Sequence, residues 1–249
     1  MRKRVKNGEA AEVPLAHDVR VLTHEQAQSF YNRMGAKQDW QAFYEAKATH
    51  DLIAHASFET AQAVFEFGCG TGAFAERLLA AHLSPETPYV AVDSSPTMIR
   101  LAQARLARFG SRVQVQQTDG SLQFDAPSGS YDRFVSMYVA DLLSTSDIAA
   151  LFSEAHRLLV PGGRLCLVSL TTGTGLFSRL VMSAWARLHR FSPALVGGCR
   201  PLELQALLEV RSFQVEYVQT VVAFGIPSEV VIAKRRPQTR ETIEKGASR

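Results

Sequence analysis

The amino-acid sequence predicts an α/β protein built on a doubly wound, mostly parallel sheet. From Ala63 to about Leu170, short apolar runs alternate with segments whose apolar residues recur at helical spacing. The apolar runs are nearly continuous, as expected of parallel strands that helices cover on both faces. The chain has 249 residues, of which 46% are hydrophobic and 20% charged, so it has enough apolar material for one sizeable core.

The N-terminal part is expected to be helical from Thr23 onward. Residues 1–22 lack periodicity and are expected to be a flexible basic arm. Thr23 is typical of a helix N-cap, and Gly35 would end that helix. Its apolar stripe consists of Ala27, Phe30, Tyr31 and Met34. A second helix is expected over 39–57, so residues 23–58 are predicted to form an aromatic-rich helical lid segment.

Seven strands are expected in the remaining sequence. They are predicted at 64–67, 89–92, 113–117, 133–136 and 164–170, followed by an antiparallel pair at 213–222 and 229–233. Helices are predicted between them at 73–81, 96–109 and 146–159, and Pro161-Gly-Gly163 is expected to form a loop.

One insertion interrupts this alternation. Residues 171–200 are expected to form a cap over the site, with a helix at 176–191, and a short helix is expected near 201–208. Residues 59–236 would then form one domain that includes this cap, and residues 237–249 a flexible tail.

Charge and cysteine usage exclude several classes of protein. The net charge is only +3, and basic residues gather at 1–6 and 234–236, which we interpret as solvated tails rather than a nucleic-acid surface. No apolar segment is long enough to span a membrane, so a soluble cytoplasmic protein is expected. Cys69, Cys166 and Cys199 are odd in number and widely spaced, which argues against a disulfide framework and a metal site.

A glycine-rich turn follows the first predicted strand. Glu66 lies in the strand, and Gly68, Gly70 and Gly72 follow where the chain turns into a helix. Glycines allow close approach of a ligand, and the helix start offers free N–H groups to a carboxylate, as in an amino-acid-like cofactor. The alternatives are a tight turn without a ligand and a dinucleotide site, but the GxGxxG fingerprint of the latter would need its third glycine at Ala73.

This motif, an acid followed after one residue by GxGxG, resembles the first motif of class I S-adenosylmethionine-dependent methyltransferases. The resemblance covers about 60–170, including Asp93 after the second strand, residues 118–120 after the third and 158–163 before the fifth. Residues 30–34 are similar to the aromatic helix of the ubiquinone and menaquinone C-methyltransferase branch. The resemblance implies a Rossmann-like fold and methyl transfer from S-adenosylmethionine to a small-molecule acceptor, with S-adenosylhomocysteine as product.

The resemblance also implies roles for individual residues. Asp93 would accept hydrogen bonds from the ribose hydroxyls, unless it only caps the next helix. Asp119 and Gly120 would contact adenine, unless they form a plain turn, and Met98 would pack on adenine or belong to the core. The residues expected at the cofactor are Glu66, Gly68, Cys69, Gly70, Gly72, Asp93, Ser94, Met98, Asp119, Gly120 and Met137.

The acceptor side is less defined by the sequence. Tyr138 is a candidate to orient the acceptor and Asp141 to take a proton from it, although both residue types are common structural residues beside a helix start. In-line methyl transfer needs a base only for poor nucleophiles, so no base is assigned. His189, Arg190 and Arg200 in the cap would either hold an acidic acceptor or be solvated.

Three other functions stay open. They are an RNA-directed methyltransferase or nucleic-acid-binding protein, a non-catalytic regulator that binds the cofactor, and an oxidoreductase. An exocyclic-amino methylase is expected to carry an Asn-Pro-Pro-Tyr-like element after the fourth strand, where residues 136–139 read Ser-Met-Tyr-Val. The identity of the acceptor and the oligomeric state are not predicted.

Overall fold

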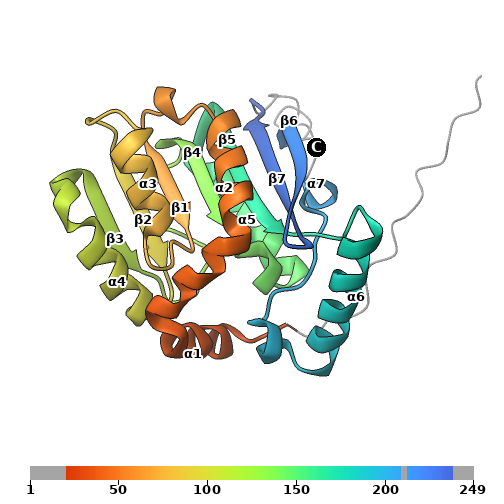
Figure 1. The fold of residues 1–249 in the computed structure, drawn as a ribbon. Coiled ribbons are helices and arrows are strands. Elements are labelled where there is room, and N and C mark those ends of the chain that lie inside the picture. Colours follow the sequence, from red (N-terminus) through yellow and green to blue (C-terminus); the bar gives the residue numbers. More distant parts are fainter. Residues whose placement is uncertain (1–20, 209–211, 238–249) are drawn as a thin grey trace, which may run out of the picture.

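The computed structural model describes residues 21–208 and 212–237, which form a seven-stranded sheet of order β3-β2-β1-β4-β5-β7-β6 (Figure 1). The strands β1 to β5 run parallel, and β7 lies antiparallel between β5 and β6. The predicted sheet is therefore confirmed. The strands are β1 Val64–Phe67, β2 Tyr89–Asp93, β3 Val113–Gln117, β4 Tyr131–Met137, β5 Leu159–Leu170, β6 Phe213–Ala223 and β7 Ile226–Arg235.

Helices cover both faces of this sheet. They are α1 His24–Met34, α2 Ala42–His55, α3 Ala73–Ala81, α4 Pro96–Leu106, α5 Thr145–Leu158, α6 Leu176–Phe191 and α7 Leu204–Leu207. Buried residues of α2, α3 and α4 pack with Val64 on one face, whereas those of α5 and α7 pack with Phe65 on the other. Side chains alternate along a strand, so Glu66 points to the same face as Val64.

The chain reverses its direction of winding between β1 and β4. It runs outward from β1 through β2 to β3 and then returns to β4 on the other side of β1, where Phe67 pairs with Ser136. Ligands of open α/β sheets bind at such a switch point, outside the carboxyl ends of the strands. Helix α1 and the 3₁₀ segment η1 Gly35–Gln41 lie at this edge (Figure 1).

Helix ends agree with their capping residues, but some predicted boundaries are wrong. Thr23 forms a capping box at α1, and Ser95 Oγ accepts from the N–H of Met98 at α4. The helix predicted over 39–57 begins only at Ala42, because residues 35–41 form η1. The helix predicted over 96–109 ends at Leu106 and continues as a 3₁₀ segment.

The loop predicted at Pro161-Gly-Gly163 is part of β5. The strand begins at Leu159, which pairs with Tyr131, and a register shift between Tyr131 and Arg133 accommodates the irregular residues. A glycine at the φ of +81° seen for Gly162 is tolerated at such a bulge. Pro161, Gly162 and Gly163 are residue types typical of loops, but the pairing of β5 with β4 keeps them in the sheet.

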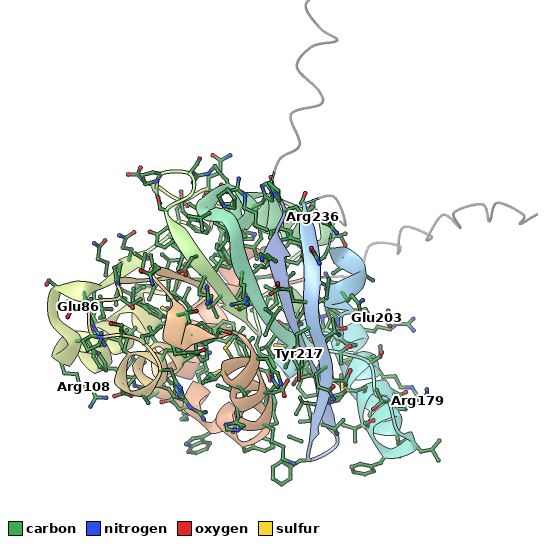
Figure 2. All side chains as sticks on the ribbon, turned by 90° about the horizontal axis from the view of Figure 1, so that it is seen from above. Glu86, Arg108, Arg179, Glu203, Tyr217 and Arg236 are labelled. Atoms are coloured by element: carbon green, nitrogen blue, oxygen red, sulfur yellow. The ribbon has the colours of Figure 1, made fainter. Side chains whose placement is uncertain are left out.

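The C-terminal strands end differently from the prediction. Phe224 and Gly225 have φ of +52° and +84°, as in a two-residue hairpin turn between β6 and β7. Lys234 and Arg235 belong to β7 and pair with Gln214 and Phe213, so these basic residues are not in a solvated tail. Figure 2 labels Tyr217 of the edge strand β6. Its hydroxyl donates a 2.9 Å hydrogen bond to Oδ2 of Asp51 on α2.

Three further predictions concern termini, membrane and cysteines. The arm predicted for 1–22 and the tail predicted for 237–249 lie outside the described residues, except for 21, 22 and 237. Within 21–208 and 212–237, no helix combines the length and apolar character that a membrane crossing requires. The three cysteines are free and buried.

Candidate functional site

The glycine turn after β1 cannot carry side chains at two of its positions. Gly68 has a φ of +77°, and a Cβ there would lie 2.3 Å from Cγ2 of Val139. A Cβ on Gly72, which has the same φ, would lie 3.1 Å from that of Ala102, so this glycine allows α3 to approach α4. The turn is held by the N–H groups of Gly68 and Cys69, which both donate to the carbonyl of Val92.

The third glycine faces the N-terminal segment. A Cβ on Gly70 would lie 2.9 Å from Oε1 of Gln38, which belongs to η1. This Oε1 atom is buried and has no hydrogen-bond partner among the described residues. Buried polar atoms are normally hydrogen-bonded, so the glycine turn and Gln38 offer an acceptor to a ligand with N–H groups.

Asp93 joins the end of β2 to the glycine turn. Its Oδ2 accepts a 2.9 Å hydrogen bond from the N–H of Gly70, and its Oδ1 accepts one of 2.8 Å from the N–H of Ser95. Burial raises the pKa of this carboxyl, although the N–H donors of Ser95, Gly70 and Ser94 oppose the shift. Each carboxylate oxygen has a further lone pair, so Asp93 has capacity left for a diol.

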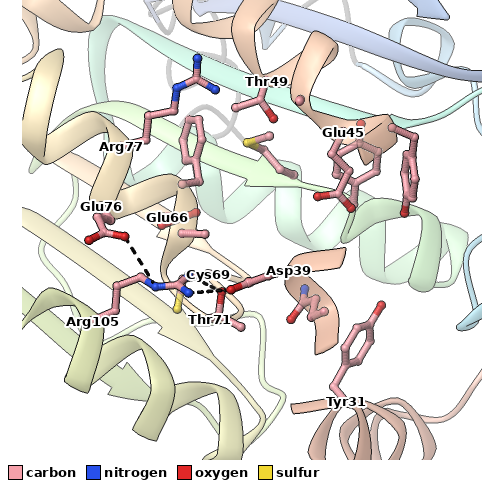
Figure 3. A pocket seen from close by; sticks show the side chains of 18 of the residues that line it. Tyr31, Asp39, Glu45, Thr49, Glu66, Cys69, Thr71, Glu76, Arg77 and Arg105 are labelled. Carbon is pink, nitrogen blue, oxygen red and sulfur yellow. Dashed lines mark hydrogen bonds and ion pairs between the residues drawn. The ribbon is translucent and has the colours of Figure 1, made fainter. Parts of the chain in front are cut away.

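Two neighbouring cavities lie at this edge of the sheet. The larger has a volume of about 360 Å³ (Figure 3), and the smaller, which Asp93 lines, has about 110 Å³. Both are lined by Tyr31, Gln38, Gly68, Met137 and Tyr138, so they form two parts of one site. The site spans the carboxyl ends of β1, β2 and β4.

The structure brings most of the sequence-predicted residues to these cavities. Glu66 and Cys69 line the larger one, Ser94 and Gly120 line the smaller one, and Gly70 lies against Gln38, which lines both. Five predicted residues do not themselves line either cavity: Gly70, Gly72, Met98, Asp119 and Asp141. Met98 is 1% exposed in the core, whereas Asp119 is exposed and accepts a 2.8 Å hydrogen bond from the N–H of Ser121. Their contacts with adenine stay predictions.

Glu66 has a partner on the neighbouring strand. The hydroxyl of Tyr89 donates a 2.8 Å hydrogen bond to its Oε2, and both side chains are buried. Burial raises the pKa of Glu66 to about 7, against the effect of the Tyr89 hydrogen bond. This carboxyl therefore gains or loses its proton near neutral pH.

The loop after β4 places Tyr138 between the cavities and the beginning of β7. Tyr138 has a φ of +54°, which is strained for a residue with a side chain, and its hydroxyl lies 2.9 Å from Oγ of Ser228. Its ring contacts that of Tyr44 edge to face, with centroids 5.9 Å apart. Asp141, three residues later, is completely buried, and burial raises its pKa to about 7.

The sequence predicts no role at the site for five residues of the N-terminal segment. Tyr31, Gln38, Asp39, Tyr44 and Glu45 all line the larger cavity. The only signal was the presence of polar residues within an aromatic helical segment. Periodicity cannot show which face of a helix meets a distant strand end.

Hydrogen bonds fasten this segment to the sheet edge. Arg105 Nη2 lies 2.6 Å from Oδ2 of Asp39, and the hydroxyl of Thr71 donates a 2.6 Å bond to Oδ1 of the same residue. The hydroxyl of Ser95 donates a 2.6 Å bond to Oδ1 of Asn32. The N-terminal segment is thus tied to both the glycine turn and α4.

The predicted cap contributes little to these cavities. Helix α6 lies beside β7 (Figure 1), and of residues 171–200 only Cys199 lines a cavity. The expectation that α6 covers the site is therefore corrected. His189 is buried, Arg190 is exposed, and Arg200 donates to the carbonyl of Leu143, and none of the three lines a cavity.

Comparisons with known proteins agree with this geometry. Residues 64–163 match the family model described as a methyltransferase domain. The chain is 31% identical to a malonyl-[acyl-carrier protein] O-methyltransferase of Hahella chejuensis, over 54% of this chain and 50% of that protein. It is 30% identical to a demethylmenaquinone methyltransferase of Tropheryma whipplei, over 53% of this chain and 54% of that protein. The chain thus spans about half the length of these curated relatives.

A solved structure has the same fold. The N-methyltransferase NodS from Bradyrhizobium japonicum, in complex with S-adenosylhomocysteine, superposes with a TM-score of 0.64. The match covers 85% of this chain and 99% of that chain, at 20% identity.

Proposed function

We propose that the chain is a class I S-adenosylmethionine-dependent methyltransferase and that it transfers a methyl group from S-adenosylmethionine to a small-molecule acceptor. The observation that carries this proposal is the junction of the glycine turn with Asp93 at the switch point of the sheet, beside two adjoining cavities. The names of the two relatives, a malonyl-[acyl-carrier protein] O-methyltransferase and a demethylmenaquinone methyltransferase, support an organic acceptor rather than a nucleic acid.

The residues present fit this methyl donor. Asp93 has acceptor capacity for the ribose hydroxyls, and the unpartnered Oε1 of Gln38 beside Gly70 suits the ammonium of its methionyl part. The backbone at Gly120 would face adenine, because Gly120 lines the smaller cavity next to His24. Met98 and Asp119 remain candidates for adenine as well.

Methyl transfer requires mainly that the acceptor is positioned in line with the methyl group. Bound S-adenosylmethionine supplies a methyl group already activated by its sulfonium, so the protein has to hold an acceptor in line and exclude water. We assign the orientation of the acceptor to Tyr138 and its loop, which lies between both cavities. We propose that residues 23–58 act as the lid of a domain that spans 59–236, because α1 and η1 are fastened across the site.

A methyl-transfer assay tests this function. Purified protein is incubated with S-adenosylmethionine and separate pools of amines, phenols, quinols and carboxylates, and formation of S-adenosylhomocysteine is followed. Acceptor-dependent product from at least one pool is expected. A protein that binds S-adenosylhomocysteine but gives no product with any pool would be a cofactor-binding regulator, contrary to the proposal.

A further inference from the structure

The larger cavity has one wall that belongs to neither the glycine turn nor the strand ends. Glu45 and Thr49 of α2 lie on this wall, away from Asp39 and Thr71 near the glycine turn (Figure 3). Beside Glu45 stand three phenol side chains that also line the cavity: Tyr31, Tyr44 and Tyr138. The wall therefore combines one carboxylate with several aromatic rings.

The carboxylate on this wall has no ion-pair partner within the described part of the chain. Among the described residues, Glu45 forms no salt bridge. Of the two arginines that line the cavity, Arg105 is bonded to Asp39 and Thr71, and Arg77 is exposed on α3. The cations of the predicted cap lie outside the cavity, so Arg77 is the one arginine that lines the cavity without a salt bridge among the described residues.

A second carboxyl group, that of Asp141, is buried near the same wall. Asp141 is 0% exposed, and burial raises its pKa, although the backbone N–H groups of Leu170 and Asp141 and the charge of Arg200 oppose the shift. Its charge acts on Tyr31, Tyr44 and Glu45, because it raises the pKa of each of them. An ammonium group in the cavity would be attracted both by these acids and by the faces of the phenol rings.

Resting on the proposed function, we propose that the acceptor is a primary or secondary amine, which this wall binds as its ammonium and which Glu45 deprotonates for methylation. A proton passes from the ammonium to a carboxylate oxygen of Glu45. The nitrogen lone pair then forms a bond to the methyl carbon, and the carbon–sulfur bond breaks with its electron pair on sulfur. The products are an N-methylammonium and neutral S-adenosylhomocysteine, and Glu45 returns its proton to solvent.

The surroundings of Glu45 suit this exchange of a proton. Burial raises its pKa to about 7, the hydrogen bond from Tyr44 opposes the shift, and the charges of Asp141 and Asp39 add to it. At neutral pH a large fraction of Glu45 is therefore ionised and ready to accept a proton. The titratable groups that act on Glu45, or on which it acts, are Asp39, Tyr44, Tyr138, Asp141 and Cys199.

The test compares acceptor classes and Glu45 variants of the full chain. Benzylamine, N-methylbenzylamine and a short alkyl diamine are assayed beside matched phenols and carboxylates, and binding of S-adenosylhomocysteine is measured by calorimetry in parallel. We expect turnover of amines. Glu45→Gln should lower kcat/KM on the order of 10²-fold, the usual contribution of a general base, and leave S-adenosylhomocysteine affinity within about twofold. Glu45→Asp should recover part of the rate, and the rise of rate with pH near 7 should disappear in Glu45→Gln.

Glu59→Gln is the matched control, since Glu59 is an exposed glutamate outside both cavities. Methylation of phenols or carboxylates in place of amines, or binding of S-adenosylhomocysteine without turnover of any amine, would overturn the amine class and leave the cofactor site intact. An unchanged pH profile in a folded Glu45→Gln protein would overturn the role of Glu45. Failure to bind S-adenosylhomocysteine at all would instead contradict the proposed function itself.

Discussion

The N–H of Gly70 donates a 2.9 Å hydrogen bond to Oδ2 of Asp93, so the glycine turn after β1 is joined directly to the end of β2. The sequence predicts that both elements contact one cofactor, although Gly70 and Asp93 are 23 residues apart. The hydrogen bond shows that Asp93 is also a structural acceptor. The effect of substituting Asp93 must therefore be measured both on the stability of the protein and on its affinity for S-adenosylhomocysteine.

Asp93→Ala should weaken binding of S-adenosylhomocysteine by about ten- to a hundredfold or more. Hydrogen bonds to a charged group contribute about 1.5 to 3 kcal/mol each, and water replaces them in part. Asp93→Asn should fall between alanine and wild type, because the amide keeps one acceptor oxygen. Calorimetry gives the affinities, and thermal unfolding gives the stability.

Ser144→Ala supplies the control for stability. Ser144 caps α5 by accepting from the N–H of Asp147, and its loss should cost about 1 kcal/mol without touching the cofactor. Equal affinity of wild type and a folded Asp93→Ala protein would remove Asp93 from the ribose site.

Asp39→Ala should loosen the N-terminal segment. The change removes the 2.6 Å pair with Arg105 and the hydrogen bond from Thr71, which together hold the pKa of Asp39 below its usual value against the effect of burial. Both partners are about a third exposed or less, so the pair contributes on the order of 1 kcal/mol. Faster hydrogen exchange over α1 and η1 is expected, together with a several-fold loss of S-adenosylhomocysteine affinity.

Glu216→Ala is the control variant for Asp39→Ala. It removes the Arg164–Glu216 salt bridge, whose exposure is similar to that of the Arg105–Asp39 pair. It should leave exchange in α1 and η1 unchanged. Equal protection of the lid in wild type and Asp39→Ala, with and without S-adenosylhomocysteine, would contradict a lid held by Asp39.

Glu66→Gln should make stability less dependent on pH. Because burial raises the pKa of folded Glu66 from an ordinary 4.5 to about 7, the folded state binds more protons between these values. Its contribution to stability is therefore complete below about pH 4.5 and is lost as the pH rises through about 7. This difference in pKa corresponds to a free energy on the order of 3 kcal/mol.

In the variant, the amide oxygen can still accept from Tyr89, so the protein should be at least as stable as wild type at pH 8. Thermal unfolding from pH 5 to 8 measures the slope. A residual slope of the same sign is expected from Asp141 and Glu45, whose pKa values are also raised to about 7. If stability depends on pH with the same slope in wild type and Glu66→Gln, Glu66 is ionised in the folded protein from pH 5 to 8, contrary to this prediction.

Tyr138→Phe and Asp141→Asn should lower turnover more than cofactor affinity. The first removes the hydroxyl that lies 2.9 Å from Ser228 Oγ and leaves the ring in contact with Tyr44. Asp141→Asn removes a buried carboxyl group near the wall of the larger cavity that carries Glu45. Single-turnover rates beside S-adenosylhomocysteine affinity separate the two effects, and unchanged rates in both variants would exclude this loop from the acceptor site.

Much of the fold could be predicted because local signals agreed with the sheet. The capping residues Thr23 and Ser95 mark true helix starts, and the apolar run at 64–67 is β1 itself. Prediction failed where pairing overrides local preference. Pro161 and its neighbouring glycines are typical of a loop, but β5 takes them up because β4 runs alongside from Tyr131.

The sequence predicts which strand-end residues lie at the candidate site, whereas it does not predict which residues of the N-terminal segment reach it. Gly68 and Asp93 belong to motifs whose roles follow from their place at strand ends. Gln38 and Glu45 reach the same cavity from 3₁₀ and α-helical segments that fold back across the sheet edge. No spacing in the sequence relates Glu45 to Tyr138, because their proximity depends on how the N-terminal segment packs.

Calorimetric titration of the wild-type protein with S-adenosylhomocysteine, beside an identical titration with a nicotinamide dinucleotide, tests the central claim most directly. We predict saturable one-to-one binding of S-adenosylhomocysteine, weakened by Asp93→Ala, and no binding of the dinucleotide. Binding of the dinucleotide together with the absence of S-adenosylhomocysteine binding would contradict the assignment of this site to S-adenosylmethionine.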